Sequence, residues 1–219
     1  MTAKKKVTSD FILAAYMDYV LEHDHRPKSV FTFAKENNFE EARFYDFFGS
    51  FDAVEQEIFR AFFDNTLKIL DSSEEYQNYD AKNKLLGFYF TFFENLSANR
   101  SYVVFALNKK KEKLNTLRTL SLLRNEFGKF IDDLDIETLN LNEENLNKAQ
   151  ASAIRNSAWI QLLMTMKFWL DDGSASFQKT DIFIEKSIKA SFELLNIKPL
   201  QSIVDLGKFM LKEKMNIKT

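Results

Sequence analysis

The residue types that carry out most enzyme chemistry are scarce in this sequence. It contains no cysteine and only two histidines, His23 and His25. Disulfides, thiolate metal sites and a cysteine nucleophile are therefore excluded, and two histidines are too few for a histidine-rich metal cluster. No phosphate-binding P-loop, glycine-rich dinucleotide turn or Gly-x-Ser-x-Gly elbow occurs. We therefore expect no enzymatic activity, no metal and no cofactor, and we interpret His25 as a packing residue because no catalytic partners surround it.

Side chains between residues 28 and 46 offer a different chemistry, which is contact with nucleic acid. Ser29 can donate a hydrogen bond to a phosphate, and Arg43 can read the edge of a guanine. Lys28 can add a flanking positive charge. Such contacts require helices that present these groups on an outward face.

The composition predicts that the surrounding elements are helices. The 219 residues include only five glycines and two prolines, with 45% hydrophobic and 28% charged residues, which is typical of a globular all-α chain. The net charge of −2 gives the whole chain no bulk attraction to nucleic acid. The longest uncharged, apolar-leaning run, Asn156 to Met166, is shorter than the ~20 residues of a membrane span. No signal peptide is recognisable, so we expect a cytoplasmic protein without a membrane span.

Two short helices are expected first. Ser9 can cap a helix in which apolar residues recur at helical spacing. Pro27 then interrupts the chain, and Ser29 caps a second helix over Val30 to Glu36.

A third short helix is expected after a tight turn. Asn37-Asn38 ends the second helix, because asparagine tolerates the left-handed conformation better than most residues. The third helix covers Glu40 to Phe48 and is closed by Gly49-Ser50. Short helix, tight turn and short helix form a helix-turn-helix.

Longer helices are expected in the rest of the chain. They cover about 52–70, 80–96, 101–108 and 113–134, a long segment ending near 170, and then about 180–196 and 200–214. The basic run at 109–113 is interpreted as a solvated helix end, with attraction to a membrane surface as the alternative. The acid pairs at 132–133 and 171–172 are interpreted as solvated loop and helix-end residues.

Several short segments share an uninterrupted spacing from residue 12 to residue 54. They are Ile12-Leu13-Ala14-Ala15, Ser29-Val30 with Phe33-Ala34, Asn38-Phe39, Phe44-Tyr45-x-x-Phe48 and Ser50-x-Asp52-x-Val54. As a set they resemble the amino-terminal helix-turn-helix of the TetR repressor family. The resemblance implies a DNA-binding-like head over residues 1–50 and a ligand-binding, dimerising helical body over residues 51–219.

The resemblance also implies sites. The DNA-binding positions would be Lys28, Ser29, Glu40, Glu41, Ala42, Arg43, Tyr45 and Asp46. In the family, the last two long helices of the body pair with their copies in a second subunit, so a homodimer is expected. The dimer interface would contain Leu162, Leu163, Met166, Ile184, Ser187, Ile188, Ser191 and Leu195.

The charge of the expected recognition helix argues against DNA binding. From Glu36 to Asp52 there is one arginine against five acids, a net charge of −4. An acid near a phosphate adds repulsion and forgoes a counterion-release contact. Glu40 and Glu41 also favour the helix dipole, whether or not DNA is bound. The run Lys4 to Lys6 can form a DNA-contacting arm, but we interpret it as a solvated tail.

Two functions therefore remain open. One is a transcriptional regulator, a DNA-binding dimer controlled by a small apolar ligand in the body. The other is a TetR-like protein that has lost DNA binding and binds a lipid or a quinone-like molecule, as the lipid-binding proteins of coenzyme Q biosynthesis do. The likeness of fold alone does not decide between them.

The ligand pocket of either function would be aromatic. The chain contains 23 phenylalanines. The side chains that can line an apolar pocket between the helices of the body are Phe88, Phe92, Phe105, Phe127 and Trp159. The alternative is that these rings are ordinary core, since aromatic residues at helical spacing usually pack against other helices.

Overall fold

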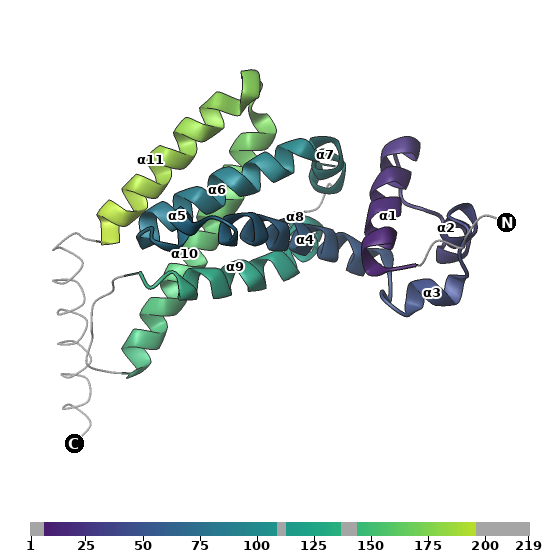
Figure 1. The fold of residues 1–219 in the computed structure, drawn as a ribbon, viewed down its shortest axis with the longest axis horizontal. Coiled ribbons are helices and arrows are strands. Elements are labelled where there is room, and N and C mark those ends of the chain that lie inside the picture. Colours follow the sequence, from purple (N-terminus) through teal and green to yellow (C-terminus); the bar gives the residue numbers. More distant parts are fainter. Residues whose placement is uncertain (1–6, 109–112, 137–143, 196–219) are drawn as a thin grey trace. The chain divides into compact units, whose positions relative to one another are not determined.

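The structure is a computed structural model that describes residues 7–108, 113–136 and 144–195 (Figure 1). Every regular element among these residues is helical, as the composition predicts. The elements are α1 (Ser9–His23), α2 (Val30–Glu36), α3 (Glu41–Tyr45), α4 (Phe51–Asp71), α5 (Glu74–Gln77), α6 (Ala81–Ala98), α7 (Arg100–Asn108), α8 (Lys113–Thr119), α9 (Ser121–Asp133), α10 (Glu144–Asp171), the 3-10 turn η1 (Ala175–Phe177) and α11 (Gln178–Leu195).

Side-chain caps fix where the first helices begin. The Oγ1 atom of Thr8 accepts a hydrogen bond from the Phe11 N–H at 3.1 Å, so Thr8, and not Ser9 as expected, caps α1. Ser29 caps α2 as predicted, and its Oγ atom accepts from the Thr32 N–H at 3.1 Å. Asn38, with φ 58°, takes the left-handed conformation expected of it after α2.

The third helix is shorter than expected. It covers Glu41–Tyr45, and Glu40 is its N-cap residue without a side-chain capping bond. Phe44 and Phe48 anchor the segment because both are buried, and the Phe48 N–H still donates to the Phe44 carbonyl. The segment expected to continue the helix to Phe48 is therefore a non-helical turn that packs against the core.

An aromatic core holds α1, α2 and α3 against the start of α4. Phe33 of α2 is fully buried at its centre. Its ring packs edge-on against five others at centroid distances of 5.6–6.3 Å, namely Tyr16, Tyr19, Phe39, Phe44 and Phe51. Edge-to-face packing of this kind is the favoured geometry of aromatic pairs. The three short helices around this core are hereafter called the head.

Further along the chain, two expectations about helix boundaries are tested. Ser50 caps α4 as predicted, since its Oγ atom accepts from the Ala53 N–H at 3.2 Å. The single helix expected over about 113–134 is instead two, α8 and α9, which are separated at Leu120. Leu120 is buried at the break. The short helix α5 was not expected.

The chain packs as two compact units. The first is drawn from Met1–Gln77 and Phe88–Lys129, and the second from Asn78–Gly87 and Phe130–Thr219. In the first unit α1 packs on α4 and α7, and α8 packs on α4. The expected division at residue 50 into a head and a body stays a prediction.

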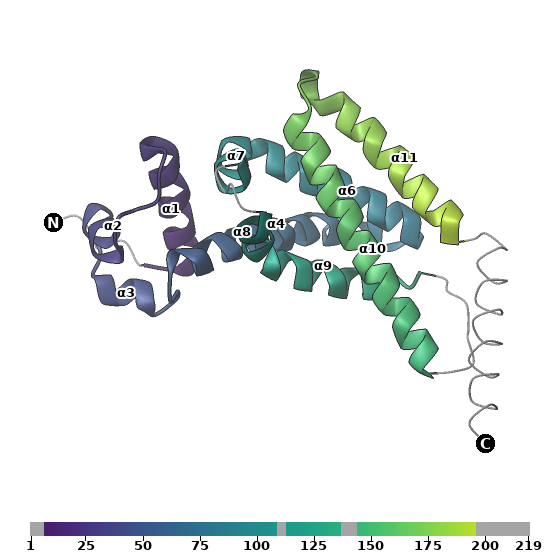
Figure 2. The same ribbon diagram turned by 180° about the vertical axis from the view of Figure 1, so that it is seen from behind.

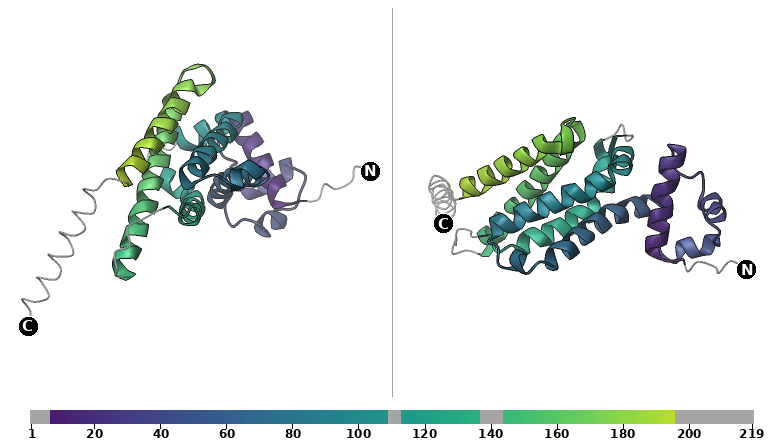
Figure 3. Two further views of the ribbon diagram at one scale, coloured as in Figure 1. Left: turned by 60° about the vertical axis from the view of Figure 1, so that its left-hand side comes forward. Right: turned by 45° about the horizontal axis from the view of Figure 1, so that its top comes forward.

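The second unit contains the helix pair α10 and α11. α10 rises to the turn at 172–177 and α11 returns from it (Figures 2 and 3). Phe168 and Phe183 stack across the pair with ring centroids 4.6 Å apart. The pair is therefore held by direct side-chain packing.

The turn between α10 and α11 corrects an expectation about acids. Asp172 is buried and not merely solvated. Its Oδ1 atom accepts from the N–H and Oγ of Ser174 at 2.8 and 2.7 Å, and its Oδ2 atom accepts from the N–H and Oγ1 of Thr180 at 2.9 and 2.7 Å. Asp132 is likewise engaged, because its carboxylate pairs with Arg155 of α10 at 2.9 Å. Asp172 was misjudged because its partners are supplied by the turn, whereas Asp132, at 45% exposure, is a solvated residue near the end of α9.

Some expected features lie outside the described residues. They are the lysines at 4–6 and 109–111 and the predicted helix over 200–214.

Candidate nucleic-acid interface

The outward face of α3 carries most of the expected DNA-binding side chains. Because Phe44 and Phe48 are buried, the residues between and before them face outward. Ala42, Arg43 and Asp46 are exposed, and Tyr45 is 54% exposed. The structure thus presents these residues together on the surface of the head.

Electrostatics on this face are dominated by acids. The Arg43 Nη1 atom lies 2.9 Å from the Asp46 Oδ2 atom. The Arg43 side chain is 65% exposed and the Asp46 side chain is 50% exposed. The hydrogen bond to Asp46 and the charge of Asp46 raise the pKa of Arg43, with a smaller contribution from Glu40. The only cation expected to read a base is therefore engaged with a neighbouring carboxylate, while Glu41 lies half-buried beside it.

Ser29 and Lys28 lie at the start of α2. Both are exposed. The Ser29 hydroxyl is used in the capping box with Thr32, whose Oγ1 atom lies 3.1 Å from the Ser29 Oγ atom. A phosphate oxygen can only accept, so a phosphate contact requires the Ser29 O–H to turn away from Thr32 while the Ser29 Oγ atom keeps the capping bond from the Thr32 N–H.

A buried polar cluster lies where the head meets α4. The Glu55 side chain is only 1% exposed, and its Oε1 atom accepts from the Tyr16 hydroxyl at 2.8 Å and from the Arg26 Nε at 2.7 Å. The Arg26 Nη2 atom lies 2.5 Å from Glu55 Oε2, and its Nη1 atom lies 2.8 Å from Asp52 Oδ1. This bidentate pair connects the loop after α1 to the first turns of α4.

Sequence reasoning missed this cluster. Glu55 follows Val54, an expected core position, and nothing in the local pattern indicates that the acid itself is buried. Its partners are 39 and 29 residues away, at Tyr16 and Arg26. The only available signal was an arginine immediately before Pro27.

A hollow lies on the head beside α1. Its volume is about 550 Å³, and its lining includes the aromatic rings of Phe11 and Tyr19 and the acids Asp18, Glu22 and Glu36. No sequence motif predicted it. Its acids make it unsuited to phosphate, so it does not extend the DNA-contacting face.

The residues expected to form the ligand pocket are divided. Phe88, Phe92 and Phe127 are fully buried in the first unit, with the Phe88 ring centroid 5.4 Å from each of the other two. Phe105 on α7 is half-buried, and Trp159 belongs to the second unit, where it is buried. The first three rings pack against each other as a core does. The pocket stays a prediction.

The residues expected at the dimer interface also differ in exposure. Leu162, Met166, Ile184 and Ile188 are buried within the single chain, at 2% exposure or less. The others, Leu163, Ser187, Ser191 and Leu195, are half-buried. Gln161 hydrogen-bonds Ser187 and Ser191 across the α10–α11 pair, at 3.2 and 3.0 Å. Much of the expected set therefore holds the two helices of one chain together.

Other apolar side chains of the same helices point outward. Ile160 and Met164, one turn apart on α10, are 56% and 58% exposed, and Ile182 and Leu194 on α11 are 50% and 59% exposed. Ile160 and Met164 share one face of α10, and exposed apolar side chains that gather in this way are a sign of an interface.

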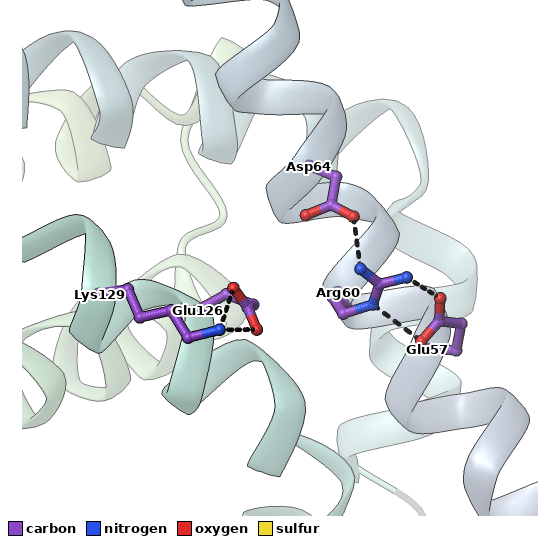
Figure 4. Close-up of polar contacts among 5 residues, drawn as sticks. All are labelled: Glu57, Arg60, Asp64, Glu126 and Lys129. Atoms are coloured by element: carbon purple, nitrogen blue, oxygen red, sulfur yellow. Dashed lines mark hydrogen bonds and ion pairs between the residues drawn. The ribbon is translucent and has the colours of Figure 1, made fainter.

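Charged side chains form ion pairs on α4 and on α9, outside the head. Arg60 pairs with Glu57 and, at 3.0 Å, with Asp64 on α4, while Lys129 pairs with Glu126 on α9 at 2.8 Å (Figure 4). The pKa of Asp64 is raised above its ordinary value, because burial and the charge of Glu126 outweigh the lowering effect of Arg60. These are surface ion pairs of one helix turn, which contribute little stability.

Two other kinds of site are not found among the described residues. No group of three or more histidine, cysteine, aspartate or glutamate side chains that could hold a metal ion occurs among them. None of their helices is long and apolar enough to cross a membrane.

Comparison with known proteins identifies the class. The described elements are all helical, with short helices first and longer ones after them, as in an all-α TetR-like fold. A family model described as the tetracyclin repressor-like C-terminal domain matches residues 84–210, more than half of the 219 residues. The chain belongs to the TetR family and is a TetR-family regulator. No curated protein matches the chain.

Proposed function

We propose that this chain is a transcriptional regulator that acts in the cytoplasm as a homodimer on DNA, under the control of a small apolar ligand bound in its body. The observation that carries the proposal is the outward face of α3, where Arg43 and Tyr45 are exposed while Phe44 and Phe48 anchor the helix to the core. A recognition helix needs this arrangement, because its side chains must reach the base edges of the major groove.

The acids on the same face set the kind of DNA binding. Asp46 neutralises Arg43, and Glu40 and Glu41 add negative charge beside it. Phosphate contacts supply most non-specific affinity, so this head binds unrelated DNA weakly. Specific binding then depends on base contacts, with Arg43 exchanging Asp46 for a guanine. Lys28 and Ser29 supply the flanking backbone contacts.

The homodimer is proposed to form through α10 and α11. Four of the side chains first expected there are buried within one chain, so the exposed apolar residues of the two helices are the better contacts. These are Ile160, Met164, Ile182 and Leu194. A two-fold axis that brings two such faces together buries them against each other.

The ligand is proposed to be apolar because the candidate side chains are aromatic. Phe88, Phe92 and Phe127 already contact one another, so a ligand would border or part this cluster, next to half-buried Phe105. The polar cluster of Glu55, Arg26 and Tyr16 connects α4 to the head, so we propose that it transmits a ligand-induced change of structure from the body to the head.

The second candidate function is a TetR-family protein that no longer binds DNA and binds a lipid or quinone-like molecule. The Arg43–Asp46 pair and the acids around it favour this function. The two functions share the body and differ in the head.

Fluorescence anisotropy separates the two functions. Labelled duplexes tiling the region upstream of the protein's own coding sequence are titrated at about 50 mM salt, where phosphate contacts are strongest. The regulator predicts one duplex that binds more tightly than an unrelated duplex of equal length. Absence of any preferred duplex, together with a lipid co-purifying in native mass spectrometry, supports the second function.

A further inference from the structure

The hollow beside α1 is lined by acids that have no cationic partner. These acids, Asp18, Glu22 and Glu36, are all exposed. Within the described part of the chain none of the three forms an ion pair, whereas Asp46 on α3 pairs with Arg43. Like charges around one hollow repel one another, so a cation that enters the hollow relieves this repulsion.

Aromatic side chains form another part of the hollow. Phe11 and Tyr19 contribute their rings. The Tyr19 ring is held from two sides, because it stacks on His23 with ring centroids 4.2 Å apart and meets Phe33 edge-on at 6.1 Å. Burial and the charge of Glu36 raise the pKa of Tyr19, which indicates that this acid lies near the ring. Rings and carboxylates together suit a lysine, whose charge both attract and whose methylene stem packs on the rings.

The chain carries lysines immediately before α1. Residues 1–6, which lie outside the described residues, include the run Lys4 to Lys6 and no acid. The described chain before α1 includes Thr8, whose Oγ1 atom accepts a hydrogen bond from the N–H of Phe11 at 3.1 Å. Phe11 itself lines the hollow. Residues 1–6 therefore join the head at the edge of the hollow.

The segment is long enough to follow the hollow. An α-helix rises about 1.5 Å per residue, so Asp18 lies about 14 Å along α1 from Ser9, and Glu22 lies about 20 Å from it. An extended chain spans about 3.4 Å per residue, so Lys4 can lie about 17 Å from Ser9 before its four-carbon stem is counted. A tethered group also has an effective concentration on the order of millimolar, which favours it over a free cation.

We propose that residues 1–6 dock in the hollow, with the ammonium groups of their lysines against the carboxylates of Asp18, Glu22 and Glu36. Because Glu36 is the last residue of α2, the docked segment connects α1 to the end of α2. The sequence alone favoured a solvated tail for Lys4 to Lys6, because it does not show that acids of two helices share one hollow. The docking does not depend on the proposed function.

Zero-length cross-linking of the free full-length protein tests the docking. A water-soluble carbodiimide joins a lysine amine to a carboxylate in contact with it as an amide, and mass spectrometry of the peptides identifies both residues. At about 20 mM salt, where screening is weak, links from Lys4 to Lys6 are expected about fivefold more often on the three acids of the hollow than on Glu40 and Asp46. At about 500 mM salt this excess should fall about twofold or more.

Two double variants separate docking from a general effect of charge. Glu22→Gln with Glu36→Gln removes two of the three carboxylates, so links to Asp18 should fall about threefold. Glu74→Gln with Glu75→Gln removes two acids of α5, outside the head, and should leave the links to Asp18 unchanged. All four substituted side chains are exposed, so both variants are expected to fold.

A mixture of unlabelled and 15N-labelled protein shows which copy supplies the segment, and links within one chain are expected. Three results overturn the proposal. Links that are no more frequent on the hollow than on Glu40 and Asp46 would mean that the lysines are solvated. An equal fall in both double variants would mean that only net charge matters. Links mainly between a labelled and an unlabelled chain would mean that a second copy fills the hollow.

Discussion

The guanidinium of Arg43 and the carboxylate of Asp46 lie 2.9 Å apart on the exposed surface of α3. To read a guanine, Arg43 must leave this carboxylate. Asp46 then faces the DNA phosphates without a neutralising partner and is repelled by them. Asp46→Asn removes the repulsion and loosens Arg43. At low salt we expect the variant to bind its preferred duplex about fivefold more tightly, measured by anisotropy.

Asp18→Asn is the control for this change, because Asp18 is an exposed acid of the head that lies on α1. It alters the net charge equally and is expected to leave the affinity nearly unchanged. Equal tightening by both variants would show that only the overall charge of the head matters, and that the Arg43–Asp46 pair has no special position.

The dimer is predicted to depend on exposed residues of α10. Met164 is 58% exposed, and a carboxylate at that position would be buried beside its copy in the two-fold interface. Met164→Asp is therefore expected to raise the dimer dissociation constant by about 30-fold or more, as loss of a central contact does. Analytical ultracentrifugation over a range of concentrations measures this.

Two variants control for non-specific damage. Leu117 on α8 is another exposed apolar residue, at 46%, and Leu117→Asp should leave the dimer intact. Leu162→Ala removes a fully buried side chain and should lower the melting temperature while the dimer persists. A dimer that survives Met164→Asp but dissociates with Leu117→Asp would place the interface elsewhere.

The Asp172 turn predicts a dependence of stability on pH. Hydrogen bonds from the Ser174 side chain, followed by those from the Ser174 backbone and from Thr180, hold the pKa of Asp172 well below its ordinary 3.8. The unfolded chain therefore binds a proton more readily, so this contribution is complete above the ordinary pKa and is lost as the pH falls below it.

Asp172→Asn reveals the contribution by difference. The wild type should exceed the variant in melting temperature at pH 7, and the gap should narrow progressively as the pH falls from about 4 towards 2. Subtracting the two curves removes the titration of the other carboxylates. A gap that stays constant over this range would show that the carboxylate charge is not what holds the turn.

Phe127 distinguishes a packed core from a ligand pocket. It is fully buried, and its ring centroid lies 5.4 Å from that of Phe88. Phe127→Ala is expected to lower the free energy of unfolding by about 3–5 kcal/mol in urea denaturation, because a cavity replaces the ring. Phe105→Ala, at a half-buried position, should cost less than half as much. A small effect at Phe127 would indicate a ring that already borders an open cavity.

Local signals in the sequence predicted the parts of the fold that local interactions determine. Ser29 and Ser50 cap helices because their hydroxyls bond backbone groups three residues away. Asn38 ends the turn after α2 by its own backbone preference. Such contacts do not require knowledge of the rest of the chain. Thr8, and not Ser9, caps α1 because two adjacent hydroxyl residues could each serve as the cap and the sequence alone does not choose between them.

The features that the sequence did not predict depend on contacts with residues elsewhere in the chain. The burial of Glu55 depends on Tyr16 and Arg26, and the burial of Asp172 depends on a loop that returns through Thr180. Helical periodicity found the apolar residues of α10, but it could not tell that Leu162 faces its own chain while Met164 faces outward. The sequence predicted the helices and not the choice of face.

Arg43→Ala tests the central claim most directly. The duplex preferred by the wild type and an unrelated duplex are titrated with both proteins at about 50 mM salt. The account predicts that the variant loses about 10- to 100-fold in affinity for the preferred duplex, so that the two duplexes become equal, while the weak binding of the unrelated duplex is unchanged. A wild-type protein that prefers no duplex, or a variant that keeps the preference, would contradict recognition of DNA through α3.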